Sequence, residues 1–441
     1  MSAGALTAGP LRPVILRLAA PAVGMMACHF SFNLIDSIWV GRLIGPAALG
    51  AVSTGGFFVW VVLSLAEMMD VGLIAVAARL HGQGDPERAA RVSTGVVLAA
   101  IGAGLVVGVA GSALVDPLFR AMAVPPEVAS LGRRYLGAWL VGTPLVFGFF
   151  ALEAAFRSAG DTRTPFLILA TSVLVNVVLD PLLIAGVGPL PRLGVAGAGL
   201  ASVMVRGGAF VLGFGIALRR GLLRLRTPEW SAVPDVLRVG APISAAGVLF
   251  SVIYMWLTRY TSRFGTPALA ALGIGHKLEG LGFIAISGFA LSAGALVGQN
   301  LGAGRPERAR QAVRATLSYC LVVTVTTAAA FLAAPELLVR LFTSDPAVIA
   351  DGALYLRTIA PAQIGQTFEI ILEGALAGAG YTLRPMIAST VLTGLRIPLA
   401  AWWSSAGVIG IWWALSVTAV ARGVVMTAFW WRGGWSGRRV P

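Results

Sequence analysis

Four oxygen-bearing side chains occur in three apolar segments at spacings that place them at one depth. Asp36 and Asp180 lie nine and eight residues before the glycine that ends their segment, and Ser202 lies eight after the glycine that begins the next. At 1.5 Å per helical residue, all three lie ~12–14 Å below one surface. Asn176 is four residues before Asp180, on the same helical face and one turn deeper. The spacing therefore predicts a cage of oxygen atoms.

Such a cage suits two kinds of ion chemistry. Carboxylate, amide and hydroxyl oxygens are hard ligands that could hold Na+. Alternatively, low dielectric and mutual repulsion between the two acids would keep a proton on one of them. The plain alternative is that each side chain only hydrogen-bonds a neighbouring helix. We disfavour it for the acids, because a carboxylate is costly to bury in a membrane, but for Ser202 it stays open, since serine is common at helix contacts.

A second set of charges occurs in the other half of the chain, at His276, Lys277, Glu279 and Arg396. Glu279 with Arg396 or Lys277 predicts a buried ion pair that holds the helices together. The alternative is a substrate site, or a proton-linked acid that faces a cavity. Five further acids fall towards the cytoplasmic ends of their segments, where water or loop arginines could satisfy them: Glu67, Asp70, Glu153, Glu369 and Glu373.

The segments that must position these residues are membrane helices. The chain has 441 residues, of which 57% are hydrophobic and only 12% charged, with a mean hydropathy of +0.84. A soluble protein carries roughly twice that share of charged residues. Apolar runs long enough to cross ~30 Å of hydrocarbon recur along the chain. We expect twelve spans at 14–39, 47–78, 92–114, 129–156, 165–188, 194–218, 236–260, 268–297, 312–333, 349–377, 385–403 and 407–431.

The charge distribution predicts the orientation of these spans. The net charge is +14, but the arginines cluster in short loops between apolar runs. That pattern is the positive-inside signature and not a nucleic-acid-binding face. Twelve spans place both termini on one side, and the basic loops predict that this side is cytoplasmic, in a bacterial inner membrane. The two cysteines, Cys28 and Cys320, lie within apolar runs and predict no disulfide.

The chain contains an internal repeat at a shift of 220 residues. Residues 82–89 (GQGDPERA) align with 302–309 (GAGRPERA), and 152–165 (LEAAFRSAGDTRTP) align with 372–385 (LEGALAGAGYTLRP). Six spans in each copy make the repeats parallel, and substrate sites in such proteins lie between the halves. We therefore predict an all-α membrane protein whose two six-helix lobes, 1–218 and 236–441, are joined by a cytoplasmic linker at 219–235 and enclose a central cavity.

The repeat does not reproduce the oxygen cage. At the same shift Asp36 corresponds to Trp256, Asn176 to Arg396 and Asp180 to Ala400, so any ion site is confined to the first lobe. Pro21 lies fifteen residues before Asp36 in the first span. Because proline removes a helical hydrogen bond, this span could bend there when the acid changes its occupancy.

These motifs resemble the multidrug and toxic compound extrusion (MATE) family, nearer its DinF-like branch, over nearly the whole chain. The opening motifs are residues 33–36 (NLID) and 40–52 (VGRLIGPAALGAV), and the others are 297–304 (VGQNLGAG) and Asn176-x-x-x-Asp180. The resemblance implies a cation-site role for Asp36, Asn176, Asp180 and Ser202, and a hinge role for Pro21. Ser202 stands where threonine is more usual, which would weaken that ligand. Phe250 stands where another branch carries an acid, which argues against a second-lobe sodium site of that type.

The resemblance implies a secondary active antiporter that exports small, often cationic, organic molecules in exchange for H+ or Na+ as its two lobes rock. We expect a monomer in the lipid bilayer with no other cofactor. A flippase for a lipid-linked sugar or polysaccharide precursor is the nearest alternative. An enzyme is disfavoured, because the three histidines lie on separate segments and no catalytic set converges. The sequence does not name the substrate or the coupling ion.

Overall fold

The computed structural model describes residue 7 and residues 9–121, 126–188, 191–342 and 345–436, and this part of the chain forms helices and no strands. The helices in chain order are α1 (Leu11–Leu43), α2 (Pro46–Gln83), α3 (Pro86–Ala121), α4 (Pro126–Val141), α5 (Thr143–Ser158), α6 (Arg163–Ala185), α7 (Val195–Arg219), η1 (Trp230–Ala232), α8 (Val233–Thr261), η2 (Ser262–Phe264), α9 (Thr266–Gly302), α10 (Pro306–Ala333), α11 (Pro335–Arg340), α12 (Pro346–Gly378), α13 (Leu383–Gly394), α14 (Arg396–Trp403), η3 (Ser404–Ala406) and α15 (Val408–Trp431).

The fold is a multi-pass membrane protein of twelve spans. Among the described residues, nine helices are long and apolar enough to cross a membrane, and the pair α4–α5 makes ten. The helix α12 and the pair α13–α14 supply the other two. The expected single span at 129–156 is broken, because α4 and α5 meet at an angle of 52° around Gly142. A Cβ atom at Gly142 would collide with the side chain of Val203 in α7, so glycine lets the bend pack closely there.

Large apolar side chains cover the outside of the helices. Val106 in α3, Leu174 in α6, Val211 in α7 and Val322 in α10 are between 66% and 69% exposed. A soluble protein would bury most such side chains, whereas lipid tails solvate them. The exposed apolar surface therefore agrees with the membrane class that the composition predicts.

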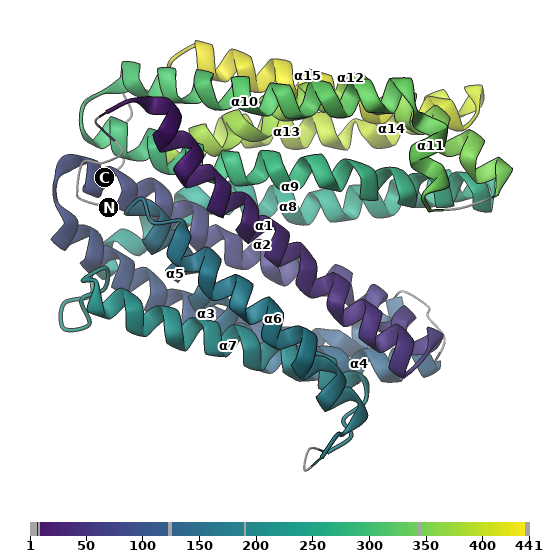
Figure 1. Ribbon diagram of the computed structural model, residues 1–441, viewed down its shortest axis with the longest axis horizontal. Coiled ribbons are helices and arrows are strands. Elements are labelled where there is room, and N and C mark those ends of the chain that lie inside the picture. The colour runs from purple at the N-terminus through teal and green to yellow at the C-terminus, as the bar shows by residue number, and fades with distance from the viewer. Residues whose placement is uncertain (1–6, 8, 122–125, 189–190, 343–344, 437–441) are drawn as a thin grey trace.

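The spans form two lobes, α1–α7 and α8–α15, which lie side by side (Figure 1). The largest cluster of buried apolar side chains draws its members from Ala22 to Val236. Two other clusters lie between Ile243 and Trp435. The helix α1 links the lobes, because Ile15 and Leu18 at its start pack with Leu296 and Ala312 of the second lobe. The exact domain boundaries at 218 and 236 stay a prediction.

The repeat is visible in the local structure. Gly45 precedes α2 with a φ of 118°, and Gly265, at the 220-residue shift, precedes α9 with a φ of 92°. Side chains other than glycine rarely adopt such angles, so both glycines turn the chain back into the bundle. We call this end the distal end. The opposite end, where α1 begins and α15 ends, is the terminal end (Figure 1).

The two lobes touch closely at the terminal end. A Cβ atom at Gly82 of α2 would overlap the backbone carbonyl of Gln299 in α9, and one at Gly302 of α9 would overlap that of Arg79 in α2. Gly82 and Gly302 are repeat-related, as are Arg79 and Gln299. Nε2 of Gln299 also donates to the Ser158 carbonyl at 2.6 Å. The terminal end is therefore closed by a symmetric pair of backbone contacts.

Candidate functional site

The four residues of the predicted oxygen cage lie together in the first lobe. The hydroxyl of Ser202 lies 3.2 and 3.0 Å from the two carboxyl oxygens of Asp36. Nδ2 of Asn176 lies 3.4 Å from Asp36 Oδ1. Asp36 is 3% exposed, and Asn176, Asp180 and Ser202 are 0% exposed. Helices α1, α6 and α7 thus place the four side chains in one buried cluster, and their function stays a proposal.

The carboxyl group of Asp180 lacks donors. Both of its oxygens are buried and accept no well-formed hydrogen bond among the described residues. The Asp36 carboxyl lies close enough to share a hydrogen bond with it when one of the two acids carries a proton. Buried polar groups in proteins are nearly always satisfied. This site is therefore suited to a proton or a cation between the two acids.

Glycines let α7 reach this cluster. A Cβ atom at Gly197 would lie 2.6 Å from the Leu183 carbonyl oxygen of α6, and one at Gly199 would lie 2.7 Å from the Tyr135 carbonyl oxygen of α4. Small residues allow membrane helices to approach closely. Because of this close packing, Ser202, one turn further along α7, contacts Asp36 of α1.

Two more polar residues belong to the cluster, and sequence reasoning missed both. Arg206 is 6% exposed, and its guanidinium carbon lies 4.2 Å from the centre of the Phe32 ring. Arg206 is one turn of α7 from Ser202, and Phe32 is one turn of α1 from Asp36. The guanidinium therefore lies about one helical turn, ~6 Å, from the acids. It interacts electrostatically with Asp36 and Asp180.

Tyr135 is the second missed residue. It lies on α4, is 2% exposed and comes within hydrogen-bonding reach of Asp36. The signal for Arg206 was present in the sequence, since an arginine inside an apolar span is itself unusual. The signal for Tyr135 was only its match with Tyr355 in the repeat.

A cavity of about 1140 Å³, including its open side, lies in the second lobe, with one wall from α2. Trp60 and Glu67 of α2 are its first-lobe members, and α8, α9 and α12–α15 supply the rest. The charged side chains in its lining are Glu67, Glu279, Glu369, Glu373, Arg396 and Arg422. A mostly apolar cavity with a few charged side chains in its lining is a candidate substrate site in a membrane protein.

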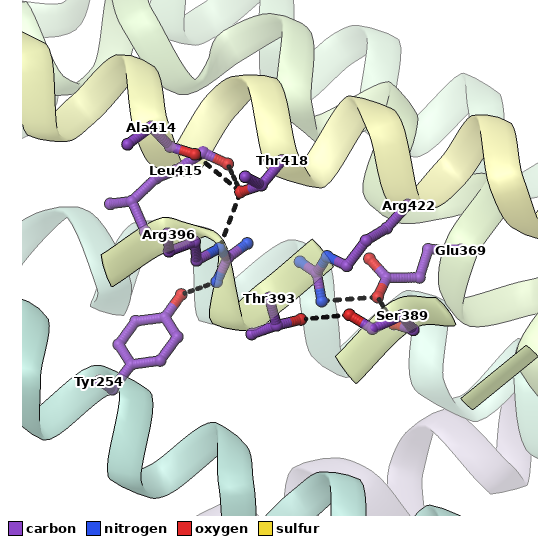
Figure 2. A network of polar contacts seen from close by, with 9 residues as sticks. All are labelled: Tyr254, Glu369, Ser389, Thr393, Arg396, Ala414, Leu415, Thr418 and Arg422. Atoms are coloured by element: carbon purple, nitrogen blue, oxygen red, sulfur yellow. Dashed lines mark hydrogen bonds and ion pairs between the residues drawn. The ribbon is translucent and has the colours of Figure 1, made fainter. Parts of the chain in front are cut away.

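One arginine of this cavity is neutralised by an acid. Nη1 of Arg422 lies 2.6 Å from Glu369 Oε1, and both side chains are less than a tenth exposed. The hydroxyl of Ser389 donates to the same Glu369 oxygen at 3.2 Å. Figure 2 shows this pair, one turn along α15 from Thr418. The pair joins α12, α13 and α15.

The other arginine has a different environment. Nε of Arg396 donates to the Thr418 hydroxyl at 2.9 Å, and Nη1 donates to the Tyr254 hydroxyl at 3.1 Å (Figure 2). Glu279 instead accepts a hydrogen bond from the hydroxyl of Tyr355. Among the described residues, no ion pair within 4.0 Å joins Arg396 or Lys277 to an acid. The expected ion pair of Glu279 with Arg396 or Lys277 is therefore not formed.

Side chains on other spans, and not loop arginines, contact three of the other acids. Arg157 of α5 pairs with Asp70 of α2, and both side chains are at most 6% exposed. Nε2 of His29 in α1 lies 3.3 Å from Glu153 of α5. Together with the Glu369–Arg422 pair, these contacts correct the expectation that water or loop arginines satisfy Asp70, Glu153 and Glu369. The partners lie on other spans, which local sequence does not reveal.

Comparison with known proteins adds independent findings. The MatE family model matches residues 21–182 and 242–402. A probable multidrug resistance protein NorM of Thermotoga maritima is 29% identical over 98% of this chain and 94% of its own length. An FAD transporter of Shewanella oneidensis is also 29% identical, over 95% of this chain and 94% of its own length. A solved multidrug resistance MATE family transporter in an outward-facing conformation shares the fold, with a TM-score of 0.90 at 22% identity, covering 100% and 99% of the two chains.

Proposed function

The chain belongs to the MatE family of membrane transporters, and we propose that it is a secondary active antiporter that exports small organic molecules in exchange for H+ or Na+. The observation that carries this proposal is the buried pair of acids, Asp36 and Asp180, within a transport fold. Intramembrane acids of this kind mark ion pathways. The acids lie in the first lobe, and the cavity with charged side chains in its lining lies mainly in the second, so ion and substrate have separate sites.

Arg206 favours the proton over sodium. Its fixed positive charge lies about one turn from the two acids, and like charges repel strongly where the dielectric constant is low. A sodium ion would have to bind beside this guanidinium, whereas a proton joins one carboxyl group and adds no separate ion. We therefore expect proton coupling.

The orientation and the conformational cycle follow from the same features. We infer that the terminal end is cytoplasmic, because its loops carry most of the arginines. In that orientation the symmetric glycine contacts close the cytoplasmic side, and exchange requires the lobes to part there. We further propose that α1 bends at Pro21 during this cycle, and that the protein works as a monomer in the inner membrane.

The kind of substrate is not decided by similarity alone. Relatives of equal identity are named for multidrug resistance and for FAD transport. We propose organic molecules of drug size, with positively charged ones included, because four acids line the cavity against two arginines. A flippase for a lipid-linked sugar is the alternative.

Transport by purified protein in lipid vesicles tests the proposal. Efflux of cationic dyes is measured first under an imposed pH gradient and then under a sodium gradient. Asp36→Asn and Asp180→Asn should each insert normally and lose gradient-driven transport. Asp116→Asn is the control, because Asp116 is exposed and pairs with Arg133 outside the cluster. Full transport in both cluster variants would remove the ion site, and flipping of a fluorescent lipid without dye transport would favour the alternative.

A further inference from the structure

We propose that Arg396 binds an anionic group, a carboxylate or a phosphate, on an aromatic substrate that occupies the second-lobe cavity. This inference rests on the proposed export function and adds a substrate class to it, namely molecules that carry an anionic group beside any positive charge. Export of organic cations alone does not require such a site.

The first argument is the lack of a counter-ion for Arg396. The residue is only 3% exposed, yet its two hydrogen-bond acceptors, the hydroxyls of Thr418 and Tyr254, are neutral. A guanidinium has five N–H donors in a fixed fork that matches carboxylate and phosphate oxygens. Burying a charge without an opposite charge is costly. Because Arg396 lines the cavity, an anion that enters the cavity can supply that charge.

The second argument is the contrast with Arg422, which lines the same cavity. Arg422 pairs directly with Glu369 at 2.6 Å, so its charge is neutralised within the protein. Figure 2 shows the two arginines near one another, with Arg422 paired to Glu369 and Arg396 bonded to the hydroxyls of Thr418 and Tyr254. One arginine therefore serves the structure and the other is available to a ligand.

The groups around Arg396 do not replace the missing counter-ion. Glu279 of α9 is the acid that interacts with it electrostatically, but Glu279 accepts a hydrogen bond from Tyr355 of α12 and forms no ion pair with Arg396. The side chains of His276 of α9 and Arg422 of α15 also interact electrostatically with Arg396, and neither can carry a negative charge. Arg396 therefore has no ion-pair partner within 4.0 Å among the described residues, which leaves its guanidinium able to bind an anion.

The third argument is the aromatic lining beside Arg396. The rings of Phe250 and Tyr254, one turn apart on α8, have centres 4.3 Å apart, and both residues line the cavity. Phe283 of α9 and Trp60 of α2 also line it. Aromatic side chains favour stacking on flat rings. The anionic group is therefore expected on an aromatic molecule.

The opposite end of the cavity carries acids without arginine partners. Glu67 of α2 and Glu373 of α12 line it, and neither forms an ion pair among the described residues. Arg396 contacts Thr418, and Arg422, one turn further along α15, contacts Glu369. Glu373 is one more turn along α12. Two turns therefore put Glu373 ~12 Å along the bundle from Arg396. A molecule with an anionic group and a cationic ring system fits this polarity.

A pair of dyes that differ in one group tests the assignment. Rhodamine 110 has a free benzoate, and rhodamine 123 is its methyl ester with the same cationic ring system. Binding to the purified protein is measured by fluorescence anisotropy, and transport is measured in phosphatidylcholine vesicles. We expect the wild type to bind and export rhodamine 110 better than rhodamine 123. Arg396→Gln should remove this preference. Its affinity for rhodamine 110 should fall roughly tenfold, and its affinity for rhodamine 123 should stay the same.

Two further variants make the test specific. Arg263→Gln is the matched control, since Arg263 also lies over a tyrosine ring, that of Tyr260, but outside the cavity. It should keep the preference. Arg396→Lys should restore part of it, because lysine keeps the charge and loses the fork. Thermal melting of each variant separates loss of binding from loss of folding.

The outcomes separate this inference from the export function. A wild type that does not distinguish the dyes, or an Arg396→Gln protein that still does, overturns the anion site even when both dyes are exported. Preferential binding of rhodamine 110 without transport supports the site and contradicts export. Loss of the preference when phosphatidylglycerol is added to the vesicles assigns the site to a lipid headgroup and overturns the proposal.

Discussion

The hydroxyl of Thr162 donates a 2.9 Å hydrogen bond to the backbone carbonyl of Leu18, three residues before Pro21. The repeat reproduces this contact in the second lobe, where Thr382 donates at 2.8 Å to Val239, three residues before Pro242. A proline disturbs the helical bonds of the turn before it, and side-chain hydroxyls can satisfy the carbonyls there. In both α1 and α8, a threonine hydroxyl from another segment thus binds the carbonyl three residues before the proline.

Thr162→Val should ease bending of α1. Loss of one hydrogen bond is worth about 1 kcal/mol, which changes a two-state population roughly fivefold. Spin labels at positions 34 on α1 and 174 on α6, both exposed, should report a broader distance distribution, and the transport rate should change. Thr382→Val is the matched control, because the helix that Thr382 holds, α8, has Trp256 at the position where α1 has Asp36. Equal effects of the two variants on transport would contradict a special role for α1.

Arg206→Gln should change the coupling ion. Without the guanidinium, sodium can approach Asp36 and Asp180, so transport that was indifferent to sodium should become stimulated by a sodium gradient. Arg206→Lys keeps a positive charge and should behave as the wild type. Arg219→Gln, at the exposed end of the same helix, controls for loss of charge elsewhere. Sodium-driven transport in the wild type would show that the guanidinium does not exclude the ion.

Arg422→Ala should destabilise the second lobe strongly. It leaves the buried Glu369 carboxylate without its partner, and breaking a buried pair in this way costs about 3–5 kcal/mol. The exposed pair of Arg133 with Asp116, at 3.2 Å, is the comparison. Arg133→Ala should cost at most about 1 kcal/mol. Melting of the detergent-solubilised protein measures both changes, and similar Tm values for the two variants would contradict the structural role of Arg422.

Gly82→Ala and Gly302→Ala should each open the terminal end. The new Cβ atoms would overlap backbone carbonyls of the opposite lobe, which cannot move aside without separating α2 from α9. A single cysteine at position 78, fully buried in this conformation, should then react faster with a thiol reagent once Cys28 and Cys320 are replaced by serine.

Gly102→Ala is the control for this experiment. It lies in α3, where a Cβ atom meets nothing within 4 Å, so the cysteine at position 78 should stay protected. Unchanged reactivity in both interface variants would mean that the glycine contacts do not hold the lobes together.

The sequence by itself determined the class, the repeat and the depth of the candidate ion site. Hydrophobic runs reveal membrane helices because lipid permits few alternatives. The common depth of Asp36, Asp180 and Ser202 followed from the fixed rise of a helix, which is a local property. The repeat placed Gly82 opposite Gly302 in the alignment, and the same symmetry appears where the lobes meet.

Only the tertiary structure decided which side chains face one another. Arg206 lies over Phe32 because of how α1 and α7 are rotated against each other, and no local pattern records that rotation. Arg396 reaches Thr418 and Tyr254 instead of Glu279 because a long side chain can choose among partners on several helices. The break at Gly142 also depends on contact with α7. Depth along a helix is set by the chain itself, whereas rotation and partner choice are set by packing between segments distant in sequence.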